Sequence, residues 1–276
     1  MIIYRILPFI YITSYVSILF LMKQVNLDSS VKALVRFGIS FLALMPLFAF
    51  NIRKLKTYNH KVYLLRALIA SCAVLLTYKV YNSLPFASAT SISLSEPLFS
   101  ALLSFLILRE SISTKKWIML FMGYIGVIVS IWPIDFANKY IMLQGFLLIA
   151  NILVSFNSIM IKQLSVKENA ITVIFYLYVY IIPVLFLLNI ILGNSVCIAN
   201  MFTFENMRIL IPIGILGAFN NLIMIYSLKK LPVSTFTSSQ YFRIFLASAM
   251  SFYAGEHISA SEVIGSIIIV ISSAFI

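Results

Sequence analysis

The chain has 276 residues, of which 62% are hydrophobic and only 10% are charged. A soluble domain is about half apolar and about one quarter charged, so this composition excludes an ordinary water-soluble fold and indicates a protein that lies mostly in lipid. The net charge of +12 does not indicate nucleic-acid binding, because the Lys and Arg residues are spread between apolar runs and form no dense patch.

Ten apolar segments follow one another along the chain, and each has about the 20 residues that a helix needs to cross a ~30 Å hydrocarbon layer. No small-residue cleavage site follows the first segment, so we interpret it as a retained helix and not as a signal peptide. Leu84-Pro85 and Leu231-Pro232 predict tight turns, because proline ends one helix and begins the next. We expect helices over residues 2–22, 32–50, 61–82, 87–108, 116–133, 140–161, 170–192, 207–228, 234–254 and 260–276.

The basic residues of the loops predict how these helices are oriented. With a cytoplasmic N-terminus, the cytoplasmic loops hold most of the loop Lys and Arg, as the positive-inside rule requires. We therefore expect a bacterial inner-membrane protein with both termini in the cytoplasm. The loop residues assigned to that side are Arg53, Lys54, Lys56, Lys61, Arg109, Lys115, Lys116, Lys162, Lys167, Lys229 and Lys230.

An internal repeat divides the chain into two halves. Residues 84–113 and 231–259 both begin with a Leu-Pro turn, continue as an apolar helix and end in Glu-Ser-Ile-Ser or Glu-His-Ile-Ser. Repeats at half the length of a membrane protein are typical of carriers built from two related halves. The predicted halves are residues 1–135 and 136–276, and since each holds five helices, they must have opposite orientations in the membrane.

Two charged residues lie far from any loop. Arg243 is about nine residues inside its predicted helix, or ~14 Å at 1.5 Å per residue, and Glu96 is the acid at comparable depth in the first copy of the repeat. Counting through the repeat aligns Glu96 with Arg243 or with its neighbour Phe242. Arg36 and Arg66 lie about one turn inside their helices, where we expect their side chains to extend to the membrane interface.

A charge at mid-bilayer costs roughly 3 kcal/mol on insertion scales, so something must offset the cost of Glu96 and Arg243. One interpretation is a structural ion pair that holds the halves together. The other is a substrate site, in which Glu96 binds a cation and Arg243 binds a carboxylate or phosphate. Both hold if the pair opens when the substrate enters.

The chain resembles the EamA-type carriers of the drug/metabolite transporter superfamily. The similarity is most specific in SLPFASATSISLSEPLFSALLSFLILRESIS followed by KKWIMLFMGYIGVIVSI, where Pro97, Glu110, Gly123 and Gly126 stand as the family pattern expects. In the second half Glu256 and Gly265 match, whereas Phe242-Arg243-Ile244 replaces a proline-centred segment. The resemblance implies an all-α integral membrane protein of ten transmembrane helices in two inverted five-helix repeats around a polar cavity. The segments VRFGIS and LLRAL, with Arg36 and Arg66, also resemble S-adenosylmethionine carriers of intracellular bacteria.

Polar side chains inside the predicted helices are further candidates for substrate binding. Such residues often only hydrogen-bond one membrane helix to another. The alternative is that several of them face one cavity, where tyrosine rings also suit cations. With Glu96 and Arg243, the predicted site contains Tyr11, Tyr15, Tyr78, Tyr81, Asn151, Ser155, Asn220, Gln240 and Tyr241; Ser14, Ser158, Asn221, Tyr176 and Tyr180 are less specific neighbours.

The sequence predicts neither an enzyme nor a cofactor or metal site. His60 and His257 lie in predicted loops, Cys72 and Cys197 form no disulfide or metal motif, and no nucleophile elbow or phosphate loop is present.

We therefore expect a secondary transporter of a small polar metabolite, most simply an amino acid or a zwitterionic derivative, that works by alternating access. Its partners would be that metabolite, the lipid bilayer, and protons or a counter-substrate, with Glu96 as the residue for proton coupling. S-adenosylmethionine is the alternative substrate. A lipid-linked substrate flippase and a non-transporting membrane scaffold are the alternatives of another class.

Overall fold

The computed structural model describes residues 2–132, 140–193, 203–255 and 260–274, and the regular structure within these ranges is helical. The first half contains α1 (Ile2–Gln24), α2 (Ser29–Phe50), the short η1 (Ile52–Lys54), α3 (His60–Ser83), α4 (Phe86–Ser93), α5 (Glu96–Leu103), the π-helical turn η2 (Ser104–Leu108) and α6 (Thr114–Ile131). The second half contains α7 (Ile141–Lys167), α8 (Ala170–Ile191), α10 (Phe204–Lys230), α11 (Val233–Ser238), the 3₁₀ turn η3 (Ser239–Phe242), α12 (Arg243–Tyr253) and α13 (Ala260–Ala274).

These helices confirm the ten predicted segments, two of which are interrupted. The fourth predicted segment is α4, α5 and η2 in sequence, and the ninth is α11, η3 and α12. Within the described residues, seven helices are long and apolar enough to cross a membrane, counting residues 86–108 as one. The other three predicted spans are α6, with 18 residues, the interrupted ninth segment, and α13, with 15. The expected boundary between the halves, at residues 135 and 136, lies outside the described residues.

The two proline turns form as the sequence predicts. Pro85 and Pro232 are the N-cap residues of α4 and α11, with nearly identical φ and ψ of −53° and 143°, and −56° and 147°. After each turn the chain runs back through the bundle. The interrupted segment α4–α5 follows α3, and the interrupted segment α11–α12 follows α10.

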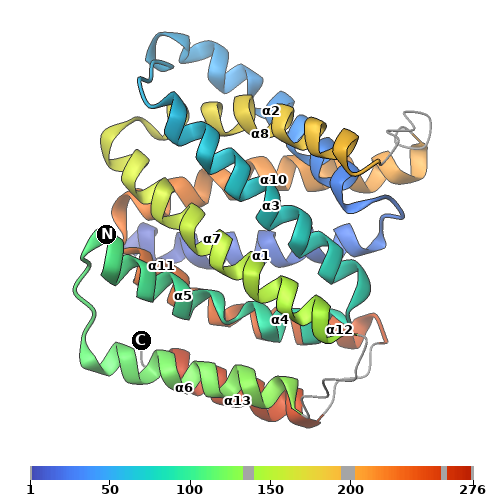
Figure 1. Cartoon of the computed structure of the whole chain (residues 1–276), viewed down its shortest axis with the longest axis vertical. Helices are drawn as coiled ribbons and strands as arrows, with labels where there is room; N and C mark the ends of the chain where they lie inside the picture. Colours follow the sequence, from blue (N-terminus) through green and yellow to red (C-terminus); the bar gives the residue numbers. More distant parts are fainter. Residues whose placement is uncertain (1, 133–139, 194–202, 256–259, 275–276) are drawn as a thin grey trace.

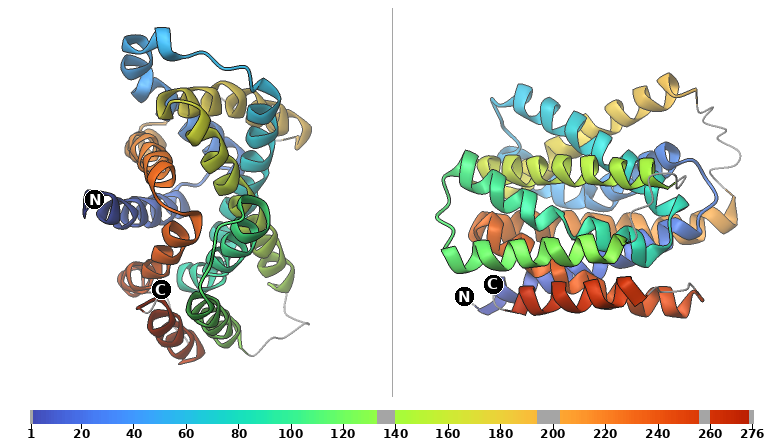
Figure 2. Two further views of the ribbon diagram at one scale, coloured as in Figure 1. Left: turned by 90° about the vertical axis from the view of Figure 1, so that its left-hand side faces the viewer. Right: turned by 60° about the horizontal axis from the view of Figure 1, so that its bottom comes forward.

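The helices form stacked layers along the longest axis of the molecule (Figure 1). Helices α2 and α8 lie at one end of this axis, and the pair α6 and α13 lies at the other. The first helices of the two halves, α1 and α7, run in opposite directions, and α1 begins and α13 ends at the same side of the bundle. The second views in Figure 2 show α6 and α13 packed along one another as a separate outer layer.

Several basic residues that the sequence assigned to loops lie within helix ends. Lys162 and Lys167 belong to the last turns of α7, which continues six residues beyond its predicted end. Lys32, the first residue of the predicted helix 32–50, is buried in α2, where its Nζ donates to the Met22 carbonyl and to Asn82 Oδ1, at 2.9 Å each. Lys162 Nζ likewise donates to the carbonyl of Leu231, at the end of α10, at 2.8 Å, so the positive charge of these lysines does not end the helix.

Candidate functional site

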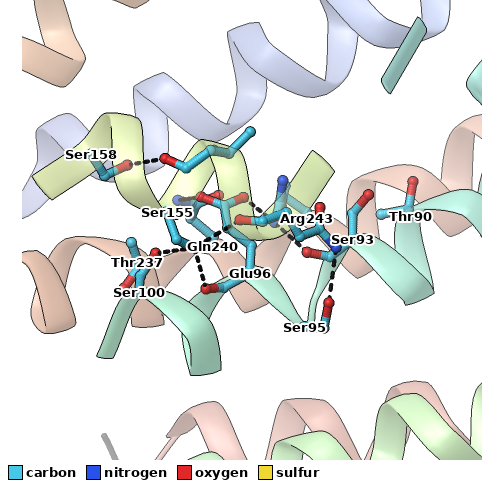
Figure 3. A network of polar contacts seen from close by, with 12 residues as sticks. Thr90, Ser93, Ser95, Glu96, Ser100, Ser155, Ser158, Thr237, Gln240 and Arg243 are labelled. Carbon is cyan, nitrogen blue, oxygen red and sulfur yellow. Dashed lines mark hydrogen bonds and ion pairs between the residues drawn. The ribbon is translucent and has the colours of Figure 1, made fainter. Parts of the chain in front are cut away.

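The helix interruptions of the two halves meet at a buried ion pair. Glu96 is the first residue of α5 and Arg243 is the first residue of α12, so each follows the break in its own helix. Arg243 Nη2 lies 3.1 Å from Glu96 Oε2, and their side chains are only 2% and 4% exposed. Glu96 and Arg243, which the repeat aligns to within one residue, are thus in direct contact between the halves (Figure 3).

Neutral groups complete the surroundings of the pair. Gln240 Nε2 donates to Glu96 Oε1 at 3.0 Å, and Arg243 Nη2 also donates to the Ser93 carbonyl at 3.1 Å. The contact between guanidinium and carboxylate uses one atom of each group and is not a bidentate fork. Arg243 Nε and Gln240 Oε1 have no hydrogen-bond partner, so the buried network retains unused donor and acceptor capacity.

Helix α7 supports the break between α4 and α5. Asn151 Nδ2 donates to the Ile92 carbonyl at 3.1 Å and to Ser95 Oγ at 2.8 Å. Ser155 Oγ contacts the Glu96 carbonyl at 3.2 Å and accepts from Ser100 Oγ at 2.9 Å. These contacts satisfy polar groups that an interrupted helix leaves open, and they fix the backbone on both sides of Glu96.

A cavity of about 90 Å³ lies beside the ion pair. Its walls come from α1, α2, α3, α7, α8 and α10, and they include neither Glu96 nor Arg243. Of the predicted site residues, Tyr11, Tyr15 and Asn220 line it. The remaining lining residues are Arg36, Phe37, Arg66, Ala70, Ala73, Val74, Val154, Asn157, Ile161, Leu177, Ile181, Asn221, Met224 and Ile225.

Two tyrosine rings separate the cavity from the ion pair. The rings of Tyr11 and Tyr15 are stacked, with centroids 5.7 Å apart and planes 8° from parallel. The Arg243 guanidinium carbon lies 5.6 Å from the Tyr15 ring centroid, and Tyr15 also lines the cavity. Asn220 fixes this part of α1, because its Nδ2 donates to the Tyr11 carbonyl at 2.8 Å and to Ser14 Oγ at 2.7 Å.

The other predicted residues fall into three places. Tyr81 contacts Ser93 Oγ and Thr90 Oγ1, at 3.1 and 3.3 Å, on the ion-pair side. Tyr78 accepts from Arg36 Nη1 at 2.6 Å, behind the cavity wall. Tyr241 packs in a separate apolar cluster with residues of α6 and α13, away from the cavity lining. The predicted residues therefore do not form one site in this structure: the pair and the cavity are adjacent but distinct.

The expectation that Arg36 and Arg66 extend to the membrane interface is wrong. Arg36 is 5% exposed and Arg66 is 1% exposed, and both line the cavity. The distance of a residue from the end of its own helix says nothing of neighbouring helices, and here α7, α8 and α10 cover both side chains. The resemblance of VRFGIS and LLRAL to other carriers was the sequence signal that singled out the two residues.

The less specific candidates lie mainly at contacts between elements. Asn221 lines the cavity and donates to Tyr178 OH at 3.1 Å, and Ser158 donates to the carbonyl of Val154 in its own helix at 3.1 Å. Tyr176 and Tyr180 do not line the cavity. Their rings stack, Tyr176 OH donates to the Leu55 carbonyl, and Tyr180 OH contacts Nδ1 of the exposed His60, the first residue of α3.

Within the described residues no three His, Cys, Asp or Glu side chains are grouped as a metal site would require. Cys72 is an exposed free thiol. Cys197, Glu256 and His257 lie outside the described residues.

Comparison with known proteins gives the class of the chain. A family profile described as the EamA-like transporter family matches residues 3–132 and 142–276. The S-adenosylmethionine uptake transporters of Rickettsia bellii and Rickettsia prowazekii are each 26% identical and span 91% of this chain, and the alignments cover 84% and 83% of those proteins. The riboflavin transporter of Vibrio cholerae is 29% identical over 58% of this chain and 54% of its own length.

A solved crystal structure of a protein that is 15% identical has a TM-score of 0.72, with 96% of this chain and 95% of that chain covered. At this identity the likeness concerns the fold alone, and it agrees with the helical arrangement described above. The family match extends over nearly the whole chain and its named relatives are transporters, not enzymes. The chain therefore belongs to the EamA-like transporter family, whose members are multi-pass membrane proteins of the drug/metabolite transporter superfamily.

Proposed function

We propose that the chain is a secondary transporter of a zwitterionic metabolite that carries a flat ring, of the class of S-adenosylmethionine. The observation that carries this proposal is the juxtaposition of a buried acid–base pair and a cavity with arginine, asparagine and stacked tyrosine walls. Carboxylates suit arginine, cations suit carboxylates and tyrosine rings, and flat rings suit aromatic walls. The likeness to S-adenosylmethionine uptake transporters over 91% of the chain favours the same substrate class.

A simple amino acid, the first expectation from the sequence, has the required carboxylate and ammonium but no ring to pack against the stacked tyrosines that lie between the cavity and the ion pair. Riboflavin is the second candidate, and the similarity to the Vibrio cholerae riboflavin transporter favours it. Riboflavin has the ring but no charged ends, so it leaves both guanidinium groups of the cavity without a counter-charge. We therefore rank S-adenosylmethionine first.

The Glu96–Arg243 pair is proposed to open during transport. In the closed pair Glu96 accepts from Arg243 and Gln240, and opening frees the carboxylate for the cationic end of the substrate or for a proton. Arginine keeps its charge, so proton coupling would use Glu96, whereas substrate exchange needs no titration. The proposed location is a bacterial inner membrane with both termini cytoplasmic.

Uptake by the purified protein in proteoliposomes tests the proposal. Radiolabelled S-adenosylmethionine should accumulate, methionine should compete weakly and riboflavin should compete least. Accumulation of riboflavin but not of S-adenosylmethionine would reverse the ranking, and movement of only a lipid-linked substrate would identify a flippase. A protein that moves none of these would fit the scaffold alternative.

The role of the ion pair is tested in the same assay with Glu96→Gln and Arg243→Ala. Each should reduce uptake by at least about tenfold, the equivalent of one lost charge-assisted contact. The exposed Glu205→Gln, on the first turn of α10, is the control and should leave uptake unchanged. Full uptake by both ion-pair variants would show that the pair takes no part in transport.

A further inference from the structure

The cavity contains two buried positive charges without a described acidic partner. Arg36 and Arg66 line it, both are more than nine-tenths buried, and no Asp or Glu is among the lining residues. Within the part of the chain that the structure describes, the one buried Arg–carboxylate pair is that of Arg243 with Glu96. Because arginine stays protonated, these guanidinium groups remain charged in a site where an unpaired charge is costly.

The partners of both guanidinium groups are neutral and leave donors unused. Arg36 Nη1 donates to Tyr78 OH at 2.6 Å, and Arg36 Nε has no hydrogen-bond partner. Arg66 Nε donates to Asn157 Oδ1 and its Nη1 donates to the Val173 carbonyl, each at 3.1 Å. Neutral acceptors orient the guanidinium groups but do not neutralise them.

Packing holds Arg36 in place. Its guanidinium carbon lies 5.1 Å from the centroid of the Phe37 ring. On the side of α10 it lies against Gly217, where an added Cβ would be 2.9 Å from Nε and 3.4 Å from Nη2. The absence of a side chain at residue 217 therefore makes room for the guanidinium, and the charged group is positioned before any ligand binds.

From this arrangement we infer that Arg36 and Arg66 form an oxyanion subsite, which binds the carboxylate end of the transported metabolite. Oxyanions are the ligands that match the planar donors of arginine. The inference rests on the proposed function for the identity of the metabolite but not for the chemistry of the subsite. Substrate-sized pockets are about 300–1,000 Å³, so a cavity of about 90 Å³ accommodates a head group rather than a whole nucleoside.

In this proposal the rest of the substrate extends past Tyr15 toward the ion pair. Tyr15 borders the cavity and also contacts Arg243, so displacement of its ring joins the subsite to the ion pair. The carboxylate then lies at Arg36 and Arg66, and the cationic groups lie toward Glu96. The carboxylate is therefore assigned to Arg36 and Arg66, and not to Arg243, which the sequence favoured.

Binding measurements on the detergent-purified protein test the subsite with four probes: S-adenosylmethionine, its decarboxylated analogue, L-methionine and inorganic phosphate. The wild type should bind S-adenosylmethionine at least about tenfold more tightly than the decarboxylated analogue, since only the first offers an oxyanion. Arg36→Gln and Arg66→Gln should bind the two compounds equally. Arg36→Lys, which keeps the charge but lacks the planar fork, should retain part of the preference and guards against loss of folding.

The exposed Arg53→Gln, in η1, is the matched control and should keep the full preference. Stabilisation by L-methionine that disappears in Arg36→Gln supports a carboxylate subsite even if S-adenosylmethionine does not bind, in which case only the proposed substrate is wrong. Stabilisation by phosphate instead would assign the subsite to phosphorylated substrates. If folded Arg36→Gln and Arg66→Gln variants kept the wild-type preference among all four probes, or if no oxyanion bound the wild type, the inference would be overturned.

Discussion

Glu96 and Arg243 stabilise each other only as a pair. Each is nearly inaccessible to solvent, and removing one partner leaves the other charge buried without compensation. We expect Arg243→Ala to lower the free energy of unfolding by about 3–5 kcal/mol, whereas replacing both residues by neutral ones of similar volume costs little. Thermal unfolding in detergent should therefore show a large loss for Arg243→Ala and near-recovery for Glu96→Gln with Arg243→Met.

That double variant should nevertheless fail to transport, because it restores packing but not the charges that a substrate would meet. Recovery of both stability and uptake would show that the pair only holds the halves together. Recovery of stability without uptake would separate the structural from the functional role.

Gly217 gives a second test at the scale of one residue. A methyl group at this position would lie 2.9 Å from Arg36 Nε, so Gly217→Ala should displace the guanidinium and weaken substrate binding about tenfold. Gly38→Ala is the matched control on α2, because a Cβ there meets nothing within 4 Å. Equal affinities for the two variants would contradict a positioned Arg36.

At the scale of elements, α6 and α13 depend on close approach at two glycines. A Cβ on Gly126 would lie 2.8 Å from the Gly265 carbonyl oxygen, and a Cβ on Gly265 would collide with Ser130 Oγ. Small residues of this kind allow membrane helices to pack backbone against backbone. Gly265→Leu should therefore separate α13 from α6 and lower the melting temperature, whereas Gly145→Leu on α7, where an added Cβ meets nothing within 4 Å, should not. A similar melting temperature for both variants would refute the close packing.

The sequence predicted the helices well because their ends have local causes. Proline at residues 85 and 232 and polar loops between apolar runs determine where the chain turns, and these signals need no tertiary information. The breaks before Glu96 and Arg243 were not predicted. The break before Glu96 has a local cause in Pro97, in the first turn of α5, because proline lacks the N–H that would continue the preceding helix; the donation from Asn151 to the Ile92 carbonyl supports it from another helix. The break before Arg243 has no proline beside it, so the local sequence does not mark it.

The candidate site shows the same division. Depth along a helix was enough to predict that Glu96 and Arg243 are buried, because a residue near the middle of a span has no route to water. It failed for Arg36 and Arg66, whose burial depends on neighbouring helices that the sequence does not place. Tyr241 was included because it is close to Arg243 in the sequence. Its side chain packs toward α6 and α13, however, and does not line the cavity.

For the whole molecule, Glu168 connects the two halves at one end of the bundle. It follows α7 and accepts from Thr57 Oγ1 at 2.6 Å, from Asn59 Nδ2 at 2.7 Å and from Tyr63 OH at 2.8 Å, groups in the α2–α3 loop and the first turn of α3. In the proposed alternating-access cycle, such contacts break when this end opens. Glu168→Gln should weaken them and shift the population toward the open state.

Labelling of a single cysteine measures that shift. With Cys72 and Cys197 both replaced by Ser and a cysteine introduced in place of the cavity residue Ala70, Glu168→Gln should react with a water-soluble maleimide several times faster than its parent. Glu205→Gln should leave the rate unchanged. Unaltered labelling in both would show that Glu168 does not restrain this end.

The stacked rings of Tyr11 and Tyr15 imply a rule about molecular length. An oxyanion short enough to fit wholly within the cavity leaves the stacked rings in place. It makes no contact with Glu96 or Arg243, so its binding does not favour opening of the ion pair. A longer molecule must displace Tyr15, at a cost of about 1 kcal/mol, and in doing so reaches the charges that join the two halves. Short anions should thus inhibit uptake by binding in the cavity without being transported. The length of a molecule should therefore distinguish a transported substrate from an inhibitor.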